Sequence, residues 1–276
     1  MFSPYYARAR RRSPEGRADP LNHCALNVAL YGRGAKHWAM TERGRQQVQC
    51  GASNLQIGPS ALQWNGNTLT IEIDEVTVPW PSRLRGVVRV HAAPRFDHPV
   101  RLSEKGGHRW FPIAPSARVE VDLSAPGLRW EGPGYLDSNR GDAPLEQAFT
   151  RWDWARAHLS KGRSAVVYDV DRIDADPLAI GLEFRHDGSV HHFESPQRAA
   201  LPSSLWRVAR TARSEPGEPM CVLQTLTDSP FYARSLVRSR WLGEPVTAMH
   251  ESLSLRRFDS AWVQALLPFR MPRNTR

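Results

Sequence analysis

Short segments in which hydrophobic and polar residues alternate recur along most of the chain. The clearest alternation lies at residues 69–73 (LTIEI) and 119–123 (VEVDL), where every second side chain is apolar. A period of two is typical of β-strands that bury one face. Runs rich in β-branched or aromatic residues add further candidates at residues 86–90, 165–168 and 182–184. The pattern therefore predicts many short strands.

Two dipeptides mark tight turns between such runs. Asn65-Gly66 and Asp187-Gly188 each lie between two segments of strand character. Both pairs tolerate the positive φ angles of hairpin turns, so each predicts a β-hairpin. Most of the 22 prolines and 19 glycines also fall between the predicted strands. Many short strands with regular turn signals are typical of an antiparallel barrel or sandwich, and we expect an all-β fold.

Residues 142–163 combine two periods. Leu145, Phe149 and Trp152 fit a helical spacing, with Asp142 as a candidate cap. The segment from Trp152 to His158 (WDWARAH) instead alternates at a period of two. A short turn of helix followed by a strand satisfies both patterns. This stretch is also the expected boundary between an N-terminal and a C-terminal β unit.

Length and composition narrow the class of protein. The 276 residues are 41% hydrophobic and 24% charged, which predicts a globular chain with a sizeable core. No apolar run approaches the roughly 20 residues of a membrane-spanning helix, and no apolar segment of a secretory signal follows the N-terminus. The three scattered cysteines favour a reducing, cytoplasmic setting. We expect the tail beyond Pro268 to be frayed.

The formal net charge of +9 is carried almost entirely by arginine. Three interpretations compete. The first is an ordinary solvated basic surface, and the second is attraction to anionic lipid headgroups. The third is nucleic-acid binding, which ranks last because no DNA- or RNA-binding motif accompanies the charge. Arginines cluster near the N-terminus and again later in the chain: Arg8, Arg10, Arg11, Arg12, Arg234, Arg238, Arg240, Arg256 and Arg257.

Motifs for the commonest enzyme chemistries are missing from the sequence. There is no G-x-S-x-G nucleophile motif, phosphate-binding loop, complete dinucleotide fingerprint or zinc-spaced set of histidines and cysteines. We therefore expect no bound cofactor and no metal.

Candidate chemistry is concentrated in two neighbouring segments, GHRWF (107–111) and GPGYLDSN (132–139). His108 and Trp110 are two residues apart, as are Tyr135 and Asp137, so on strands each pair projects to one face. Together they supply an acid, an imidazole and two aromatic rings. Each also fits an ordinary role: core aromatics for the two rings, a turn residue for the aspartate and a loop position for the histidine.

Several long sequence segments resemble those of one family, the bacterial carotenoid 1,2-hydratases (hydroxyneurosporene synthases). They run in order from Phe2 to Ala157: FSPYYARARRR, NHCALNVALYG, HWAMTERGR, LQIGPSALQWNGNTLTIEIDEVTVPWP and GYLDSNRGDAPLEQAFTRWDWARA. More distantly, GYLDSNRG and WDWARA resemble the wider lipocalin-like (AttH-like) proteins. The resemblance implies two tandem lipocalin-like antiparallel β-barrels. We place them at residues 1–157, which carry the presumed active site, and residues 158–276.

The resemblance also implies a reaction, the addition of water to the C1=C2 bond of acyclic carotenoids such as neurosporene and lycopene by a cofactor-independent hydro-lyase. It supports the same four catalytic positions. Our hypothesis is that protonated Asp137 delivers its proton to C2, and that Trp110 and Tyr135 stabilise the cation at C1. His108 then holds and deprotonates the attacking water, or returns the proton to Asp137.

Two alternatives remain from the sequence. One is a lipocalin-like carotenoid or lipid carrier without catalysis, because a fold does not determine a function. The other is an acid-initiated isomerase or cyclase of another prenyl lipid.

If the substrate is a carotenoid, we expect the protein to draw it from a membrane. We expect it to lie in the cytoplasm and to make peripheral contact with the anionic inner membrane.

Overall fold

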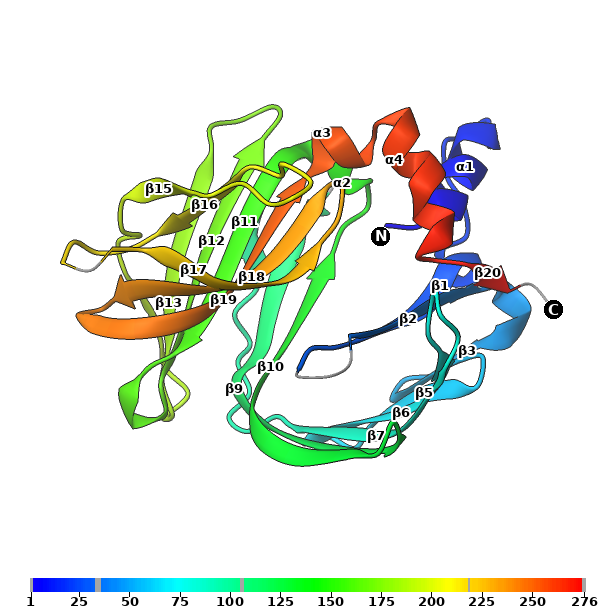
Figure 1. Cartoon of the computed structure of the whole chain (residues 1–276), viewed down its shortest axis with the longest axis horizontal. Coiled ribbons are helices and arrows are strands. Elements are labelled where there is room, and N and C mark those ends of the chain that lie inside the picture. The colour runs from blue at the N-terminus through cyan, green and yellow to red at the C-terminus, as the bar shows by residue number, and fades with distance from the viewer. Residues whose placement is uncertain (1, 33–35, 105–106, 218, 275–276) are drawn as a thin grey trace. The chain divides into compact units, whose positions relative to one another are not determined.

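A computed structural model describes residues 2–32, 36–104, 107–217 and 219–274 of the chain. The protein consists mainly of β-strands, which confirms the predicted all-β class (Figure 1). The described α-helices are short: α1 (Pro4–Arg12), α2 (Leu145–Ala148), α3 (Leu255–Phe258) and α4 (Ala261–Leu266). Single 3₁₀ turns add η1 (Pro20–His23), η2 (Arg45–Gln47), η4 (Ser160–Gly162) and η5 (Leu267–Phe269).

The chain forms two compact units that do not follow sequence order. The first unit contains residues 1–92, 118–134 and 264–276, and the second contains residues 93–117 and 135–263. The predicted division into 1–157 and 158–276 differs from these units, because two long strands each pass from one unit to the other: β9 (Arg109–Ala125) and β10 (Leu128–Arg140). A boundary between independently folding halves at residue 157 stays a prediction.

The first unit contains most of an antiparallel sheet with strand order β10-β9-β7-β6-β5-β4-β3, and β8 pairs with β9. Its other strands are β3 (Val48–Cys50), β4 (Asn54–Ile57), β5 (Ser60–Trp64), β6 (Thr68–Val76), β7 (Arg83–His91) and β8 (Val100–Arg101). A smaller sheet joins β1 (Cys24–Leu30), β2 (His37–Arg43) and β20 (Arg273–Asn274). Ala39 of β2 packs in one core with Ile73 and Leu84 of the larger sheet.

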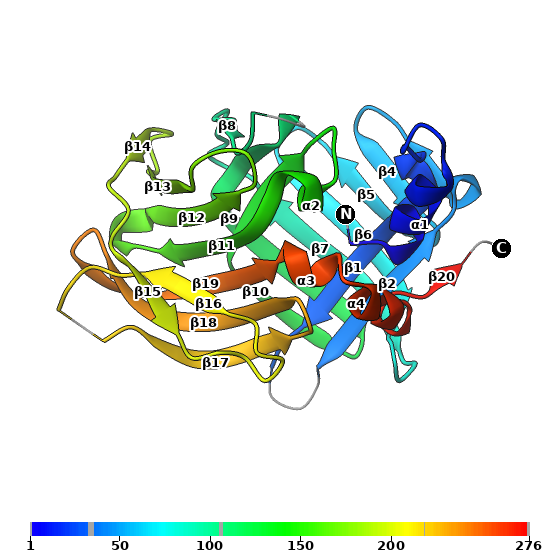
Figure 2. The same cartoon turned by 90° about the horizontal axis from the view of Figure 1, so that it is seen from above.

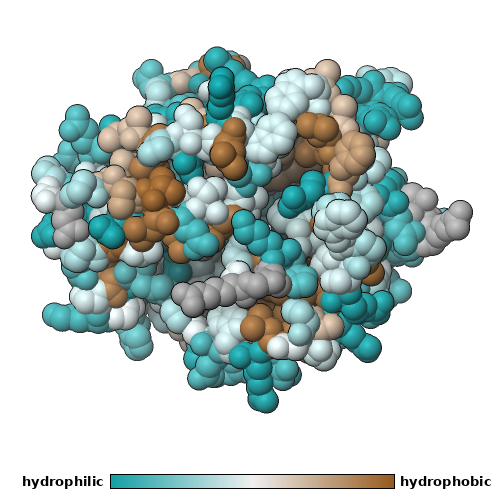
Figure 3. Space-filling view, viewed as in Figure 1, coloured by the Kyte–Doolittle hydropathy of each residue, from teal (hydrophilic) through white to brown (hydrophobic). Residues whose placement is uncertain are grey.

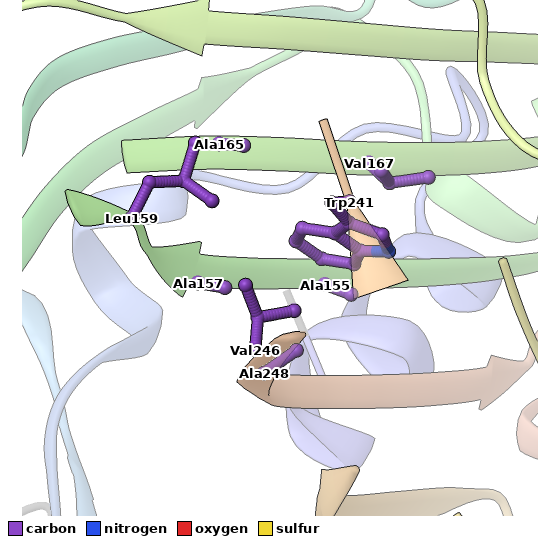
Figure 4. Packing of buried hydrophobic residues seen from close by; sticks show 8 residues of the cluster. All are labelled: Ala155, Ala157, Leu159, Ala165, Val167, Trp241, Val246 and Ala248. Carbon is purple, nitrogen blue, oxygen red and sulfur yellow. The ribbon is translucent and has the colours of Figure 1, made fainter. Parts of the chain in front are cut away.

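The second unit is built on a seven-stranded sheet with the order β14-β13-β12-β11-β19-β18-β17. A separate hairpin joins β15 to β16, as Figure 2 shows. The bounds are β11 (Phe149–His158), β12 (Ser164–Arg172), β13 (Leu178–Phe184), β14 (Val190–His192), β15 (Arg198–Leu201), β16 (Arg210–Arg213), β17 (Cys221–Asp228), β18 (Tyr232–Trp241) and β19 (Glu244–Ser254). On one face, Trp241 packs with small side chains of neighbouring strands, among them Ala155 and Val167 (Figure 4).

Local sequence signals produce the expected elements. Asn65-Gly66 joins β5 to β6, and Asp187-Gly188 joins β13 to β14, so both predicted hairpins are confirmed. Gly66 and Gly188 have φ angles of 98° and 85°, which explains the glycines. In the segment 142–163, where helical and strand periods overlap, a turn of helix, α2, leads into β11. Its N-cap is Pro144 rather than Asp142, so the predicted cap is wrong.

Neither large sheet closes on itself in the part of the chain that the structure describes. The end strands of the seven-stranded sheet are β14 and β17, and those of the larger sheet are β3 and β10. β14 offers only three residues for pairing. The antiparallel all-β architecture is therefore as predicted, but the sheets are open where closed barrels were expected.

The C-terminal tail is held in place, and the prediction that it frays beyond Pro268 is wrong for the residues described. Met271 is buried, and β20 pairs in parallel with β2. The guanidinium of Arg273 donates to the fully buried carboxylate of Glu42. Sequence alone gave no sign of this pairing, because Arg273 and Glu42 lie 231 positions apart.

Ion pairs and a hydrogen bond attach the β15–β16 hairpin to the face of the seven-stranded sheet that carries Trp241. Arg213 of β16 binds Asp169 of β12 at 2.8 Å, and Arg198 of β15 binds Asp171 at 3.1 Å. Thr211 Oγ1 donates to Asp153 of β11 at 2.8 Å. Because buried charges are costly unless paired, these contacts fix the hairpin against the sheet.

Candidate active site

Three of the four predicted site residues meet through one oxygen atom. β9 carries Trp110 and the neighbouring β10 carries Tyr135 and Asp137. The indole Nε1 of Trp110 donates to Oδ2 of Asp137 at 2.7 Å, and the hydroxyl of Tyr135 donates to the same oxygen at 2.9 Å. All three residues belong to the second unit.

This arrangement makes the two oxygens of the carboxyl group unequal. Oδ2 accepts two hydrogen bonds, whereas Oδ1 has no hydrogen-bond partner among the described residues. A protonated carboxyl group keeps its proton on the oxygen that is not already accepting donors. Oδ1 is therefore the oxygen that holds the proton when Asp137 is neutral.

The surroundings of Asp137 favour its neutral form. Burial raises the pKa of Asp137, and this effect outweighs the hydrogen bonds from Trp110 and Tyr135, which lower it. The charge of Glu251 adds a smaller upward push on the pKa. Burial, followed by the charge of Asp137, raises the pKa of Tyr135 well above its usual value. Tyr135 therefore remains a donor over the physiological pH range.

Aromatic rings surround the carboxyl group. Trp110, which is fully buried, makes an edge contact with Tyr168 of β12 at a centroid distance of 5.6 Å. Tyr135 packs against Trp154 of β11 at 5.1 Å. The rings continue along β11, since Trp152 contacts both Tyr168 at 6.2 Å and Phe149 at 6.3 Å. We call these rings the aromatic row: Phe149, Trp152, Tyr168, Trp110, Tyr135 and Trp154.

His108 lies at the far end of the aromatic row. Its ring packs against Phe149 at 5.0 Å, and the structure gives no hydrogen bond from it to Trp110, Tyr135 or Asp137. The side chain is buried, and Nε2 has no hydrogen-bond partner within the described residues. Burial lowers the pKa of His108, with Asp142 opposing, so the imidazole is neutral at pH 7 and able to accept a proton.

A row of cross-strand neighbours lies on the face of the seven-stranded sheet that carries the aromatic row. Trp154 stands opposite Tyr168 of β12 on one side and opposite Glu251 of β19 on the other. Glu251 in turn pairs with Arg234 of β18, and their side chains form an ion pair at 2.6 Å. Residues directly opposite on neighbouring strands share a face, so Glu251 stands beside the ring that supports Tyr135.

Arg156 adds a positive charge next to Tyr135. Its guanidinium carbon lies 5.4 Å from the ring centroid of Tyr135, and Nη2 donates to the carbonyl of Pro115 at 2.7 Å. Burial lowers the pKa of Arg156 to about 10, so the group stays charged at neutral pH. Burial, together with this charge, lowers the pKa of His158 to about 4.

Sequence reasoning did not assign roles to Phe149, Trp154, Tyr168, Arg156 and Glu251. A signal for part of this set was present, because the alternation from Trp152 to His158 places Trp152, Trp154 and Arg156 on one face of a strand. Tyr168 and Glu251 come from distant strands that only the pairing brings together. The described residues include no group of three or more His, Cys, Asp or Glu side chains placed to hold a metal ion.

Comparison with known proteins bears on both chemistry and fold. The family model of the carotenoid hydratase CrtC matches residues 1–276. The acyclic carotenoid 1,2-hydratase of Thiocapsa roseopersicina is 52% identical over 274 residues, which is 99% of this chain and 67% of that protein. The protein of the same name from Cereibacter sphaeroides is 38% identical over 274 residues, covering 99% of this chain and 95% of its own.

Among solved structures, an AttH protein from Nitrosomonas europaea aligns with a TM-score of 0.53. The alignment covers 80% of this chain and 77% of the other, at 13% sequence identity. At this identity the likeness concerns the fold alone, and it agrees with the predicted resemblance to lipocalin-like (AttH-like) proteins.

Proposed function

The chain belongs to the carotenoid hydratase family, and we propose that it is a cofactor-independent hydro-lyase that adds water to the C1=C2 bond of acyclic carotenoids such as neurosporene and lycopene. The observation that carries the chemistry is the carboxyl group of Asp137. Its pKa is raised by burial, and two donors on Oδ2 leave Oδ1 to present the proton.

The reaction begins with the acid. An isolated alkene is a weak base, so hydration needs a strong and well-placed proton donor. Oδ1 of Asp137 transfers its proton to C2, and the positive charge develops on the more substituted C1. As the carboxylate forms, the hydrogen bonds from Trp110 and Tyr135 strengthen, because donors bind a charged oxygen more tightly than a neutral one. The two donors thus stabilise the transition state more than the ground state.

The cation at C1 is stabilised by aromatic faces. A cation over an aromatic ring gains roughly 0.5–2 kcal/mol, with the larger values in dry surroundings. We assign this role to Trp110 and Tyr135. Arg156 and Trp154 already pack against the ring of Tyr135, so the substrate cation must approach the part of the ring that they leave uncovered.

Water completes the reaction. A new C1–O bond forms, and the water proton passes to Nε2 of His108, which is neutral and lacks a partner among the described residues. Return of that proton to Asp137 through water restores the starting state. The net change is one hydrogen on C2 and one hydroxyl group on C1.

The substrate is drawn from a membrane, because a C40 hydrocarbon does not dissolve in water. We propose that the protein acts at the cytoplasmic face of the inner membrane as a peripheral protein. None of the helices in the described ranges is long and apolar enough to cross a bilayer. Not every arginine cluster serves membrane contact: Arg234 pairs with Glu251, and Arg240 lies 3.9 Å from Glu215.

Mass analysis of pigments tests the proposal. Cells that make lycopene and no other carotenoid are grown with the wild-type chain, with Asp137→Asn, or with neither. We expect a new pigment one water heavier with the wild type only, because an amide cannot supply the proton. Unchanged lycopene that co-purifies with the protein would indicate a carrier, and a new pigment of unchanged mass would indicate an isomerase or cyclase. Near wild-type hydration by Asp137→Asn would rule out Asp137 as the acid.

A further inference from the structure

Two large apolar side chains stand exposed at the turn between β15 and β16. Leu205 is 95% exposed and Trp206 is 45% exposed, and the exposed Arg207 follows them. On the face drawn in Figure 3, hydrophobic residues reach the surface in patches separated by hydrophilic ones. An almost fully exposed leucine beside a partly exposed tryptophan forms a contiguous apolar patch, and such patches mark interaction sites more often than single exposed residues do.

The exposed turn joins a second tryptophan from α4. Trp262 is 46% exposed and stacks with Trp206 at a centroid distance of 6.4 Å and an interplanar angle of 27°. Arg257 of α3 links the pair, since its guanidinium lies 5.8 Å from the ring centroid of Trp262 and donates to the carbonyl of Trp206 at 2.8 Å. We call Leu205, Trp206, Arg207, Arg257 and Trp262 the tryptophan surface.

The backbone holds this turn in a fixed conformation. Arg207 has a φ angle of 55°, which is unfavourable for a residue with a side chain. Its N–H donates to the carbonyl of Ser204 at 2.9 Å, and Ser204 Oγ accepts from the N–H of Val208 at 3.1 Å. The N–H of Leu205 donates to Asp228 at 2.6 Å. The ion pairs of the hairpin fix its base on the sheet, so Leu205 and Trp206 are presented outward by an ordered turn.

The composition of the tryptophan surface matches the interface of a lipid bilayer. Tryptophan has an apolar ring with one polar N–H and favours the depth of lipid headgroups, where leucine reaches the acyl chains. Arginine binds phosphate through paired N–H donors. Arg207, which follows Trp206, and Arg256, which precedes Arg257, are both exposed, and Arg257 is partly exposed. In the adjoining segments, Asp259 follows α3 and is exposed, and Asp228 accepts a hydrogen bond from the N–H of Leu205.

The strands connect the tryptophan surface to the candidate active site. β19 carries Glu251 and runs directly into α3, which bears Arg257. Arg151, two residues beyond Phe149, stands opposite Ser254 at this end of the sheet. From Phe149 the aromatic row continues to Trp154, five residues along β11, or about 17 Å at the rise of a β-strand. The row of rings therefore begins at the end of the sheet where β19 runs into α3 and leads towards Asp137, on the face opposite to the one that holds the β15–β16 hairpin.

We propose that the tryptophan surface docks this protein on an anionic phospholipid bilayer, with Leu205 and the two tryptophans inserted and the arginines on lipid phosphates. The proposal rests on the proposed function for its purpose, because a carotenoid must leave the membrane to reach Asp137. Its physical basis is the exposed apolar side chains and the arginines around them.

Vesicle flotation without substrate tests the docking directly. The probes are vesicles of phosphatidylcholine alone and of phosphatidylcholine with phosphatidylglycerol. We expect the wild type to float with the anionic vesicles and to bind the neutral vesicles less. The double variant Leu205→Ser/Trp206→Ser should lose about tenfold in partitioning, because the inserted apolar area is removed. Arg207→Gln/Arg256→Gln should lose the preference for anionic vesicles. The matched control is Trp80→Ser, which removes another tryptophan, 85% exposed, in the first unit.

Two outcomes would overturn the docking proposal. One is wild-type partitioning by the Leu205→Ser/Trp206→Ser variant. The other is a wild-type dimer in light scattering that the double variant abolishes while vesicle binding stays unchanged, which would make a second copy of the chain the occupant.

A hydration assay separates failure of docking from failure of the function. With lycopene in vesicles, the double variant should be slow, and with lycopene in detergent it should match the wild type. If the wild type hydrates nothing in either form, the proposed function fails, while the flotation result still decides the docking.

Discussion

Trp110 and Asp137, on neighbouring strands, are joined by a hydrogen bond of 2.7 Å from the indole N–H to Oδ2. Since Trp110 is fully buried, this bond is shielded from competing water. The indole thus orients the carboxyl group, in addition to the stabilisation of the cation that we propose for its ring. The sequence hypothesis had assigned only the second of these roles to Trp110.

Substitution of Trp110 distinguishes the two roles. Trp110→Phe removes the donor and keeps part of the ring, so we expect kcat to fall about tenfold to hundredfold, as for loss of a hydrogen bond to a developing charge. Trp110→Ala removes donor and ring and should be worse. The measurement is initial rates with lycopene in detergent. Equal losses in both variants would show that the ring face contributes nothing to catalysis.

The protonation of Asp137 also affects stability. Because burial raises its pKa in the folded state, its contribution to stability is complete below its ordinary value of 3.8 and is lost as the pH rises through the raised value. Asparagine does not titrate, so Asp137→Asn should gain in Tm relative to the wild type as the pH increases from 4 to 8. Thermal unfolding at several pH values measures this difference.

The control for the stability prediction is Asp187→Asn. Hydrogen bonds from Ser189 lower the pKa of Asp187 in the hairpin turn, so its contribution to stability is present above its ordinary value of 3.8 and is lost only at lower pH. Between pH 4 and 8 the difference in Tm between Asp187→Asn and the wild type should therefore stay nearly constant. A pH-independent difference for Asp137→Asn would mean that folding does not raise the pKa of the carboxyl group.

Glu251 is expected to shift the alkaline limit of activity. Activity should fall at high pH when Asp137 loses its proton, and after burial the charge of Glu251 is the remaining influence that raises this pKa. Glu251→Gln should therefore move the alkaline limb of the pH–rate profile to lower pH. Glu183→Gln is a suitable control, because Glu183 is also a carboxylate paired with arginines, Arg163 and Arg185. The same shift in both variants would exclude a specific effect of Glu251.

Gly141 leaves room for the imidazole of His108. A Cβ atom at this position would lie 2.2 Å from Nδ1 of His108, so Gly141→Ala must displace the ring. We expect at least a tenfold loss of kcat with a folded protein, since displacement of a catalytic group costs activity steeply. Gly32→Ala is the control, because a Cβ there meets no atom of the described residues within 4 Å. Full activity of Gly141→Ala would argue against His108 as the proton acceptor.

Local signals in the sequence were enough for the strands, the two hairpins and the pairing of Tyr135 with Asp137 on one face. They could not reveal partners set by strand pairing across long separations. Tyr168, Trp154 and Glu251 form one row only because β12, β11 and β19 are neighbours in the sheet. The ordered tail was missed for the same reason, since Arg273 finds Glu42 only in the folded chain. The separation of His108 from the other three residues also depends on packing, here against Phe149.

The parallel pairing of β20 with β2 has a consequence for how the protein is made. Residues 264–276 belong to the first unit together with residues 1–92, whereas the second unit ends at residue 263. During synthesis, the ribosome releases every strand of the seven-stranded sheet before it releases Arg273. The unit that bears Asp137 is thus free to assemble first, whereas the pairing of β2 with β20 forms only after Arg273 has been released.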